Sequence, residues 1–327
     1  MKWLPKFRFS MRTLFIIVTL LCVLLVPLSV KLYQARQQRL AVEWLLANGG
    51  GVKYDHQVDA ERAMIFLASP PTDNRWLRRV FGNDFFDAVV EVSITNPNVT
   101  DISQLTHLRS IENVFLNNPQ NVDLSPLESL KTLDSLSINF SSKKSFTLKN
   151  MAELSKLNCP LTVILEGKLI DDLTPIQPLS NIHNLLIEEP QVTDLTPLIH
   201  LDQLESLCIS FTPVKDISAL SNLSRLKDLG LCGTQVNDFS PLSNLAQLES
   251  LTIFAPNTTD IMDLTSLGKL TNLRQLSLLT SKINDLSPLE NLVNLEHLTF
   301  SNQVSKAEID KLEKALPNCE VNEYLIF

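Results

Sequence analysis

The chain has 327 residues, of which 44% are hydrophobic, so it is long and apolar enough to bury a substantial core. Its net charge of −8 is unevenly distributed, because positions 1–39 hold seven basic side chains and no acidic one, which leaves 21 basic against 36 acidic side chains in the remainder. So acidic a body argues against a nucleic-acid partner, which would require a basic surface.

The N-terminal region predicts a membrane span. Residues 1–12 form a basic tail, and residues 13–30 then run without a charge. As a helix this run is about 27 Å long, close to the thickness of the bilayer hydrocarbon. A cleaved signal peptide is the alternative, but its apolar stretch is usually only about 7–15 residues. We therefore expect an uncleaved transmembrane helix, a signal anchor, over residues 13–33.

The basic residues around this span favour one orientation. Four precede the span and three follow it: Lys2, Lys6, Arg8 and Arg12, then Lys31, Arg36 and Arg39. The positive-inside bias favours a cytoplasmic N-terminus. A short tail and a large acidic body fit the same topology. The sequence predicts a single-pass protein of the cytoplasmic membrane, with its body on the non-cytoplasmic side.

Residues 34–90 are predicted to be a juxtamembrane helix and an N-terminal cap. Residues 31–48 are good helix formers, with Leu40 and Trp44 on one apolar face, and the glycines from Gly49 onward end the helix. Residues 52–55 are a candidate strand. Residues 75–86 read as a helical segment with a turn near Gly82.

The next part of the chain is repetitive. Three consecutive segments read VTDLTPLIHLDQLESLCISFTP, VKDISALSNLSRLKDLGLCGTQ and VNDFSPLSNLAQLESLTIF, and they align Leu198 with Leu220 and Leu242 at a constant spacing. Weaker copies extend the pattern over residues 91–303. The strand starts predicted at Leu136, Leu161 and Leu185, and those at Leu251 and Leu276, are spaced more widely. The pattern is interrupted at residues 139–160 and 254–260, which predicts longer units there. A fixed period with an L-x-x-L-x-L core indicates a solenoid whose coils each add one strand to a parallel sheet.

These units resemble the leucine-rich repeats of bacterial, internalin-like proteins, including membrane-anchored ones. The resemblance implies an α/β fold: a right-handed horseshoe with the parallel β-sheet on its concave face, preceded here by the transmembrane helix. Open ends of such a stack would expose core leucines. Residues 304–327, which include KAEIDKLEKALPNCEV, are therefore predicted to form a helix and a last strand that cap the C-terminal end.

Two polar patterns mark the convex side. A hydroxyl residue followed by proline recurs at the start of predicted short turns, where we expect the hydroxyl to cap the turn: Ser125, Thr174, Thr196, Ser240 and Ser287. Aspartates recur two positions earlier in most units: Asp101, Asp123, Asp172, Asp194, Asp216, Asp238 and Asp285. A calcium ladder is one interpretation. We favour Asx turns, because calcium solenoids use glycine-rich turns and this chain has only eight glycines.

The sequence contains no recognised catalytic motif, and its five histidines are scattered. We predict no catalytic residue, cofactor, metal or small-molecule substrate. An enzyme centred in residues 40–90 is an alternative that we do not favour. Its candidate carboxylates, which have no recognisable spacing, are Asp55, Asp59, Glu61 and Asp84.

The concave face is the predicted binding surface. The solvent-facing strand positions are mostly small and uncharged, with a few apolar residues: Phe115, Leu186, Phe211, Phe254 and Leu279. The repeat template aligns Phe115 with Leu186, and Phe254 with Leu279. Apolar anchors in a polar surround suit a protein or peptide partner. We therefore expect a non-catalytic protein-interaction module. A structural envelope protein without a specific ligand is the alternative.

Overall fold

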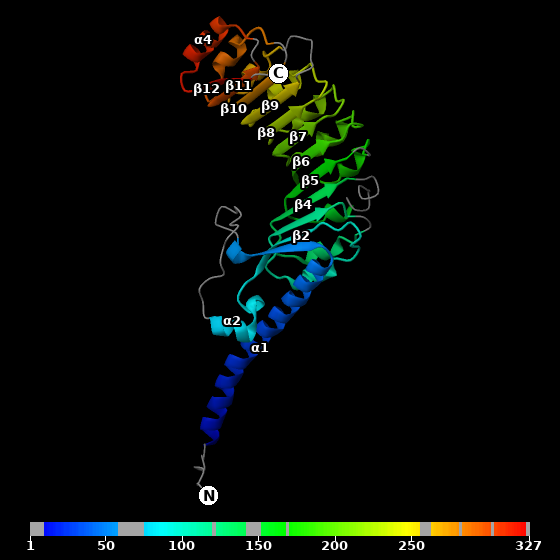
Figure 1. Ribbon diagram of the computed structural model, residues 1–327, viewed down its shortest axis with the longest axis vertical. Coiled ribbons are helices and arrows are strands. Elements are labelled where there is room, and N and C mark those ends of the chain that lie inside the picture. Colours follow the sequence, from blue (N-terminus) through cyan, green and yellow to red (C-terminus); the bar gives the residue numbers. More distant parts are fainter. Residues whose placement is uncertain are drawn as a thin grey trace.

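The computed structural model describes residues 10–57, 75–119, 122–141, 152–167, 170–255, 263–280, 283–301 and 304–324. Figure 1 shows a long N-terminal helix that leads into a curved stack of strands. Within the described residues, the strands form one 12-stranded sheet in which spatial order follows sequence order. This is the architecture of a solenoid, in which each coil contacts mainly its neighbours.

The helices of the described segments are α1 (Met11–Ala47), α2 (Arg75–Phe81) and α4 (Lys306–Ala315). The strands are β1 (Gly50–Tyr54), β2 (Val89–Ile94), β3 (Asn113–Asn117), β4 (Ser135–Phe140), β5 (Leu161–Glu166), β6 (Ile182–Glu188), β7 (Ser206–Ser210), β8 (Asp228–Cys232), β9 (Ser250–Ala255), β10 (Gln275–Thr280), β11 (His297–Ser301) and β12 (Glu320–Tyr324).

The strands line the inner side of the arc and short helical turns line the outer side (Figure 1). β1 pairs antiparallel with β2, and parallel pairing continues from β2 through to β12. The outer turns are single 3₁₀ segments such as η6 (Thr196–His200) and η7 (Ser218–Asn222), because so short a coil leaves no room for a long helix. The predicted horseshoe with a concave parallel sheet is confirmed.

Each coil buries the same leucine positions. In β7, Leu207 and Ile209 point inward and are 1% and 0% exposed, while the residues between them face outward. Leu198 and Leu204 of the same coil are fully buried from the convex side. These positions join those of neighbouring coils in one continuous hydrophobic core that runs to Leu316.

The aspartate ladder forms Asx turns, as predicted. Each carboxylate accepts a hydrogen bond from the backbone N–H two positions later, at 2.8–3.0 Å, in all seven predicted units. Asp263, which the sequence analysis missed, makes the same bond to Thr265 at 2.9 Å. The predicted role of the hydroxyls is wrong, because each turn begins at the Ser or Thr itself. The N-cap residue before it is a leucine or a phenylalanine, which has no side-chain oxygen to cap the turn. The aspartate takes over this capping.

The sheet register corrects one of the predicted repeat lengths. Val163, and not Leu161, pairs with Leu185, so this coil has the regular length of the other repeats and is not one of the longer units. An irregularity beside Leu161 lets Thr162 pair with Asn184. Inward side chains occur at every second position, so an offset of two positions leaves the same face buried. The apolar pattern alone cannot distinguish the two registers.

One continuous helix, α1, covers both the predicted span and the helix that follows it. Among the described residues it is long and apolar enough to cross a membrane by length and composition, and no residue of its most apolar stretch is buried inside the protein. The helix ends at Ala47 with Asn48 as its C-cap, and Gly49 follows with a φ of 75°, a left-handed conformation that favours glycine.

The two ends of the stack are closed by apolar contacts. Ala41, Val42 and Leu45 of α1 are buried against the first coil. At the other end, Ile309 and Leu312 of α4 are buried in the same core. Both contacts cover leucines that an open end would expose.

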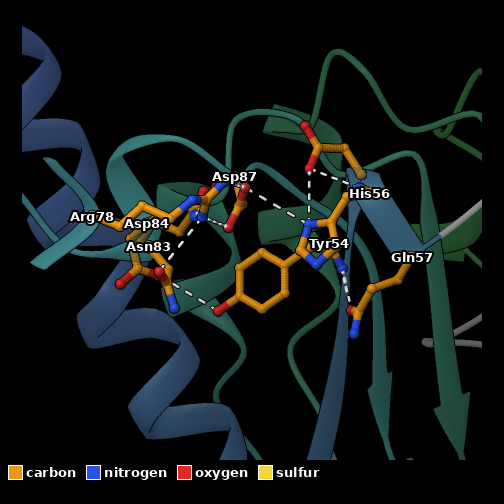
Figure 2. Close-up of polar contacts among 9 residues, drawn as sticks. Tyr54, His56, Gln57, Arg78, Asn83, Asp84 and Asp87 are labelled. Atoms are coloured by element: carbon orange, nitrogen blue, oxygen red, sulfur yellow. Dashed lines mark hydrogen bonds and ion pairs between the residues drawn. The ribbon is translucent and has the colours of Figure 1, made fainter. Parts of the chain in front are cut away.

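A polar cluster holds the N-terminal cap together (Figure 2). Arg78 donates two hydrogen bonds to Asp87, at 2.6 and 2.9 Å, and the Asp87 side chain is only 5% exposed. Asp84 accepts a bond from Arg39 of α1 at 3.1 Å and one from the Tyr54 hydroxyl of β1 at 3.5 Å. Burial and the neighbouring Asp84 carboxylate raise the pKa of Tyr54 to about 12. The cluster therefore ties α1, β1 and α2 to one another.

The turn aspartates predict an acid-sensitive contribution to stability. Asp194 accepts bonds from the hydroxyl and the N–H of Thr196, which lower its pKa. Its contribution is therefore complete above the unfolded pKa of about 3.9 and is lost as pH falls through the lower folded value. Asp194→Ala should lower the free energy of unfolding by about 1 kcal/mol at neutral pH. Asp194→Asn keeps an acceptor and should cost less. Urea unfolding at pH 7 and pH 3 measures both; an equal loss for Asp194→Ala at the two pH values would contradict the prediction.

The buried ion pair of the cap predicts a larger effect. Asp87→Ala leaves the Arg78 guanidinium, whose side chain is 11% exposed, without its main partner. The free energy of unfolding should fall by about 3 kcal/mol, as for other broken buried pairs. The double variant Arg78→Met, Asp87→Leu removes both charges and should recover most of this loss in thermal unfolding. A double variant no more stable than Asp87→Ala would refute the electrostatic explanation.

Candidate functional site

The concave face is a continuous surface of small polar side chains. One register column is mostly uncharged: Ser137, Thr162, Asn184, Ser206, Asp228, Ser250, Gln275 and His297. Asp228 is the acidic exception among these eight residues, and burial together with Glu249 raises its pKa. A face of this composition can donate and accept hydrogen bonds without the desolvation cost of many charges.

Three of the five predicted binding residues are brought together on neighbouring strands. Phe254 of β9 pairs in register with Leu279 of β10, and both are half-buried. Phe211 follows β7, and its ring lies so close to Gly233 that a Cβ at Gly233 would sit 3.0 Å from the ring. The Gly233 N–H in turn donates to the Phe254 carbonyl at 2.6 Å. The sheet register places Phe254 and Leu279 level with Ser210, the residue before Phe211, so the three lie at the same end of successive strands, and we call them the Phe211 patch.

Phe211 is held in an unfavourable backbone conformation. Its φ is 52°, and the side chain is 60% exposed. Asn118 (φ 49°) and Gly233 (φ 65°) occupy the same position after other strands. Each of the three donates its N–H to a carbonyl of the next strand, at 2.6–2.7 Å. Asparagine and glycine tolerate this left-handed region, whereas a bulky residue there costs on the order of 1 kcal/mol. Strain of this kind gathers at functional sites.

The other two predicted residues lie elsewhere on the face. Phe115 of β3 is 40% exposed and stands six strands from β9, about 29 Å along the sheet. Leu186 is aligned with Ile164 and Cys208, and not with Phe115 as the repeat template implied. Ile164 is an outward-facing apolar residue that the sequence analysis missed, although the alternation within LTVILE indicates it.

A shallow hollow of about 250 Å³ lies next to Phe254 and Leu279 of the Phe211 patch. It extends across β9, β10 and β11, and its polar lining includes Thr252, Ser277 and His297. The imidazole of His297 lies 3.2 Å from Glu320 at the end of the sheet. An apolar patch next to a polar hollow can accept both the aromatic and the polar side chains of a partner.

Charged residues line the neighbouring edge at the repeat spacing. Lys227 pairs with Glu205 at 2.7 Å, and Arg274 pairs with Glu296 at 2.8 Å. The hydrogen bond from Lys227 lowers the pKa of Glu205. Exposed pairs of this type contribute little to stability. The paired side chains do neutralise one another's charge along this edge. The sequence could have indicated these pairs, because an acidic and a basic residue occupy the same repeat position in adjacent coils.

The two candidate residues of the enzyme alternative that the structure describes, Asp55 and Asp84, lie in the cap. Asp84 accepts a hydrogen bond from Arg39 and one from Tyr54, of which Figure 2 shows the second. Asp59 and Glu61 lie outside the described residues. Asp55, His56 and Asp87 offer possible metal-ligand atoms within 4.8 Å of one another. Because Arg78 bonds both carboxylate oxygens of Asp87, we interpret this group as part of the ion-paired cap and not as a metal centre.

Comparisons with known proteins identify structures that share this architecture. No protein-family model matches the chain, and no curated protein matches it. Among solved structures, an internalin from Listeria monocytogenes is 30% identical, with a TM-score of 0.54, and the match covers 72% of this chain and 68% of that one. Internalin C2 from the same organism is 29% identical over 65% of this chain and 80% of its own, with a TM-score of 0.42.

A leucine-rich repeat protein from Leptospira interrogans shares the fold at 19% identity, with a TM-score of 0.52 over 70% of this chain and 58% of its own. The Listeria relative supports the same assignment as the repeat period, the inward leucines and the concave parallel sheet. The chain belongs to the leucine-rich repeat family, with internalins among its relatives.

Proposed function

We propose that this chain is a non-catalytic leucine-rich repeat module of a bacterial envelope, tethered to the cytoplasmic membrane by α1, that binds a protein partner on its concave face. In this proposal residues 13–33 span the membrane and residues 34–90 cap the stack. Residues 91–303 form the repeats, and residues 304–327 close the far end. The N-terminus is cytoplasmic and the repeats lie on the other side.

One observation carries the binding assignment. Phe211 keeps an exposed aromatic ring in a backbone conformation that asparagine or glycine would adopt with less strain. In a purely structural solenoid, a phenylalanine at this position would add strain without any compensating contact to a partner. A binding surface does, because exposed aromatic anchors next to polar groups contribute most of the energy of many protein interfaces. The neighbouring Phe254 and Leu279 enlarge the anchor.

The Phe211 patch predicts opposite effects on binding and on stability. Phe211→Asn places at this position the residue that Asn118 supplies in an equivalent coil. The free energy of unfolding should stay unchanged or rise by up to about 1 kcal/mol as the strain is relieved. Affinity for the partner should fall about tenfold or more, which corresponds to roughly 1.4 kcal/mol.

The matched control is Val293→Asn, which replaces a 73% exposed valine outside the concave face. A photo-crosslinking phenylalanine analogue at Phe254 captures the partner from membranes, and binding of each variant is then measured with that partner. If Phe211→Asn binds as well as the unchanged chain, the assignment of the patch is wrong. Crosslinks only between copies of this chain would favour the structural alternative.

The anchoring is tested separately. Because α1 is proposed to remain in the bilayer, the intact chain should stay with the membrane after alkaline extraction. Protease added outside spheroplasts should degrade the repeats while a cytoplasmic marker stays intact. Release of a shortened chain would favour a cleaved signal peptide. Protection of the repeats would reverse the proposed orientation.

A further inference from the structure

The short helix α2 carries an exposed face that the cap does not use. Trp76 and Val80 are 65% and 55% exposed, and Arg79 is exposed between them. Their i, i+3 and i+4 spacing places the three on one side of the helix. Arg78 and Phe81 instead contact the cap, through Asp87 and Phe85 respectively. The outer face of α2 is therefore a tryptophan, an arginine and a valine directed to the surroundings.

Contacts fix α2 at one level along α1. The Lys31 ammonium of α1 lies 4.5 Å from the centre of the Phe85 ring, and Phe85 stacks on Phe81 of α2 at 4.9 Å. Figure 1 shows α2 beside α1, between the repeat stack and the N-terminal end of the long helix. Lys31 is the first charged residue after the uncharged run of residues 13–30. α2 thus lies where that run ends.

This level coincides with a membrane surface if α1 spans a bilayer. The uncharged run covers about 27 Å of helix, close to the thickness of the hydrocarbon. Lys31, and with it α2, then lies among the lipid headgroups. Tryptophan concentrates at that depth, because its ring is apolar and its N–H can bond to water or headgroups.

The charges at this end of the cap complement an anionic surface. Lys31, Arg79 and Arg109 are exposed, and a hollow of about 200 Å³ between α1 and the first repeats is lined by both Lys31 and Arg109. The nearby carboxylates of Asp84 and Asp87 are paired with arginines. Basic groups next to a bilayer attract anionic lipids.

We propose that the Trp76–Arg79–Val80 face of α2 docks on the anionic phospholipid surface of the membrane that α1 crosses. This inference rests on the membrane anchoring in the proposed function and adds a second point of attachment. A single helix would leave the solenoid free to tilt about its exit point. With α2 resting on the lipid, the stack is held at a defined angle and its concave face has a fixed direction.

The test uses the full chain with Trp76 as its sole tryptophan, through Trp3→Phe and Trp44→Phe. The protein is reconstituted into phosphatidylcholine and phosphatidylglycerol vesicles, with or without lipids brominated near the headgroup end of their acyl chains. Trp76 emission should be lost with the brominated lipids. Arg79→Glu or Val80→Asp, or removal of phosphatidylglycerol, should reduce that loss. Val293→Asp, a remote exposed position, should leave it unchanged.

A second reporter separates the two claims. A chain with Leu20→Trp as its only tryptophan, in vesicles whose lipids are brominated near the ends of their acyl chains, reports whether α1 is in the bilayer, because position 20 lies about 16 Å along the helix from Lys31. Quenching at position 20 without quenching of Trp76 overturns the docking and leaves the anchoring intact. No quenching at either position overturns both. Shielding of Trp76 in native membranes, without quenching in vesicles, identifies a protein as the occupant and also overturns the proposal.

Discussion

The whole body depends on one constraint: a single repeat coil cannot bury its own leucines. Leu207 and Leu204 are buried only because equivalent residues of the neighbouring coils cover them. Stacking therefore has to be regular, and this regularity fixes the parallel sheet, the short convex turns and the aspartate caps that begin them. The same constraint demands closed ends, which α1 and α4 supply. With the inward positions committed to packing, function is left to the outward ones.

The Phe211 patch is where the chain departs from this regularity. Most outward positions of the sheet hold small residues in relaxed extended conformations. Phe211 instead follows its strand with a left-handed backbone, and its ring lies over Gly233. The neighbouring coil has a glycine at the equivalent place, which leaves room for that ring. The two positions complement each other, and together with Phe254 and Leu279 they form an apolar group on the concave face, separate from Phe115 and from the Ile164 and Leu186 pair.

Much of the fold was predictable because it repeats. The period, the inward leucines, the convex turns and the Asx role of residues such as Asp216 all follow from one template. The register beside Leu161 was not predictable, since an offset of two positions buries the same face. The left-handed backbone of Phe211 was not predictable either, because no residue pattern around position 211 indicates a positive φ. The polar cluster around Asp87 joins α1, β1 and α2, and no periodic pattern links those segments.

The most direct test of the central claim is hydroxyl-radical footprinting of the chain, first purified and then in native membranes where its partner is present. Phe211 is 60% exposed and should be oxidised readily in the purified protein. In membranes Phe211 and Phe254 should both be protected, while Val293 is modified equally in the two samples. Equal oxidation of Phe211 in both samples, or protection confined to the convex side, would contradict a partner bound on the concave face.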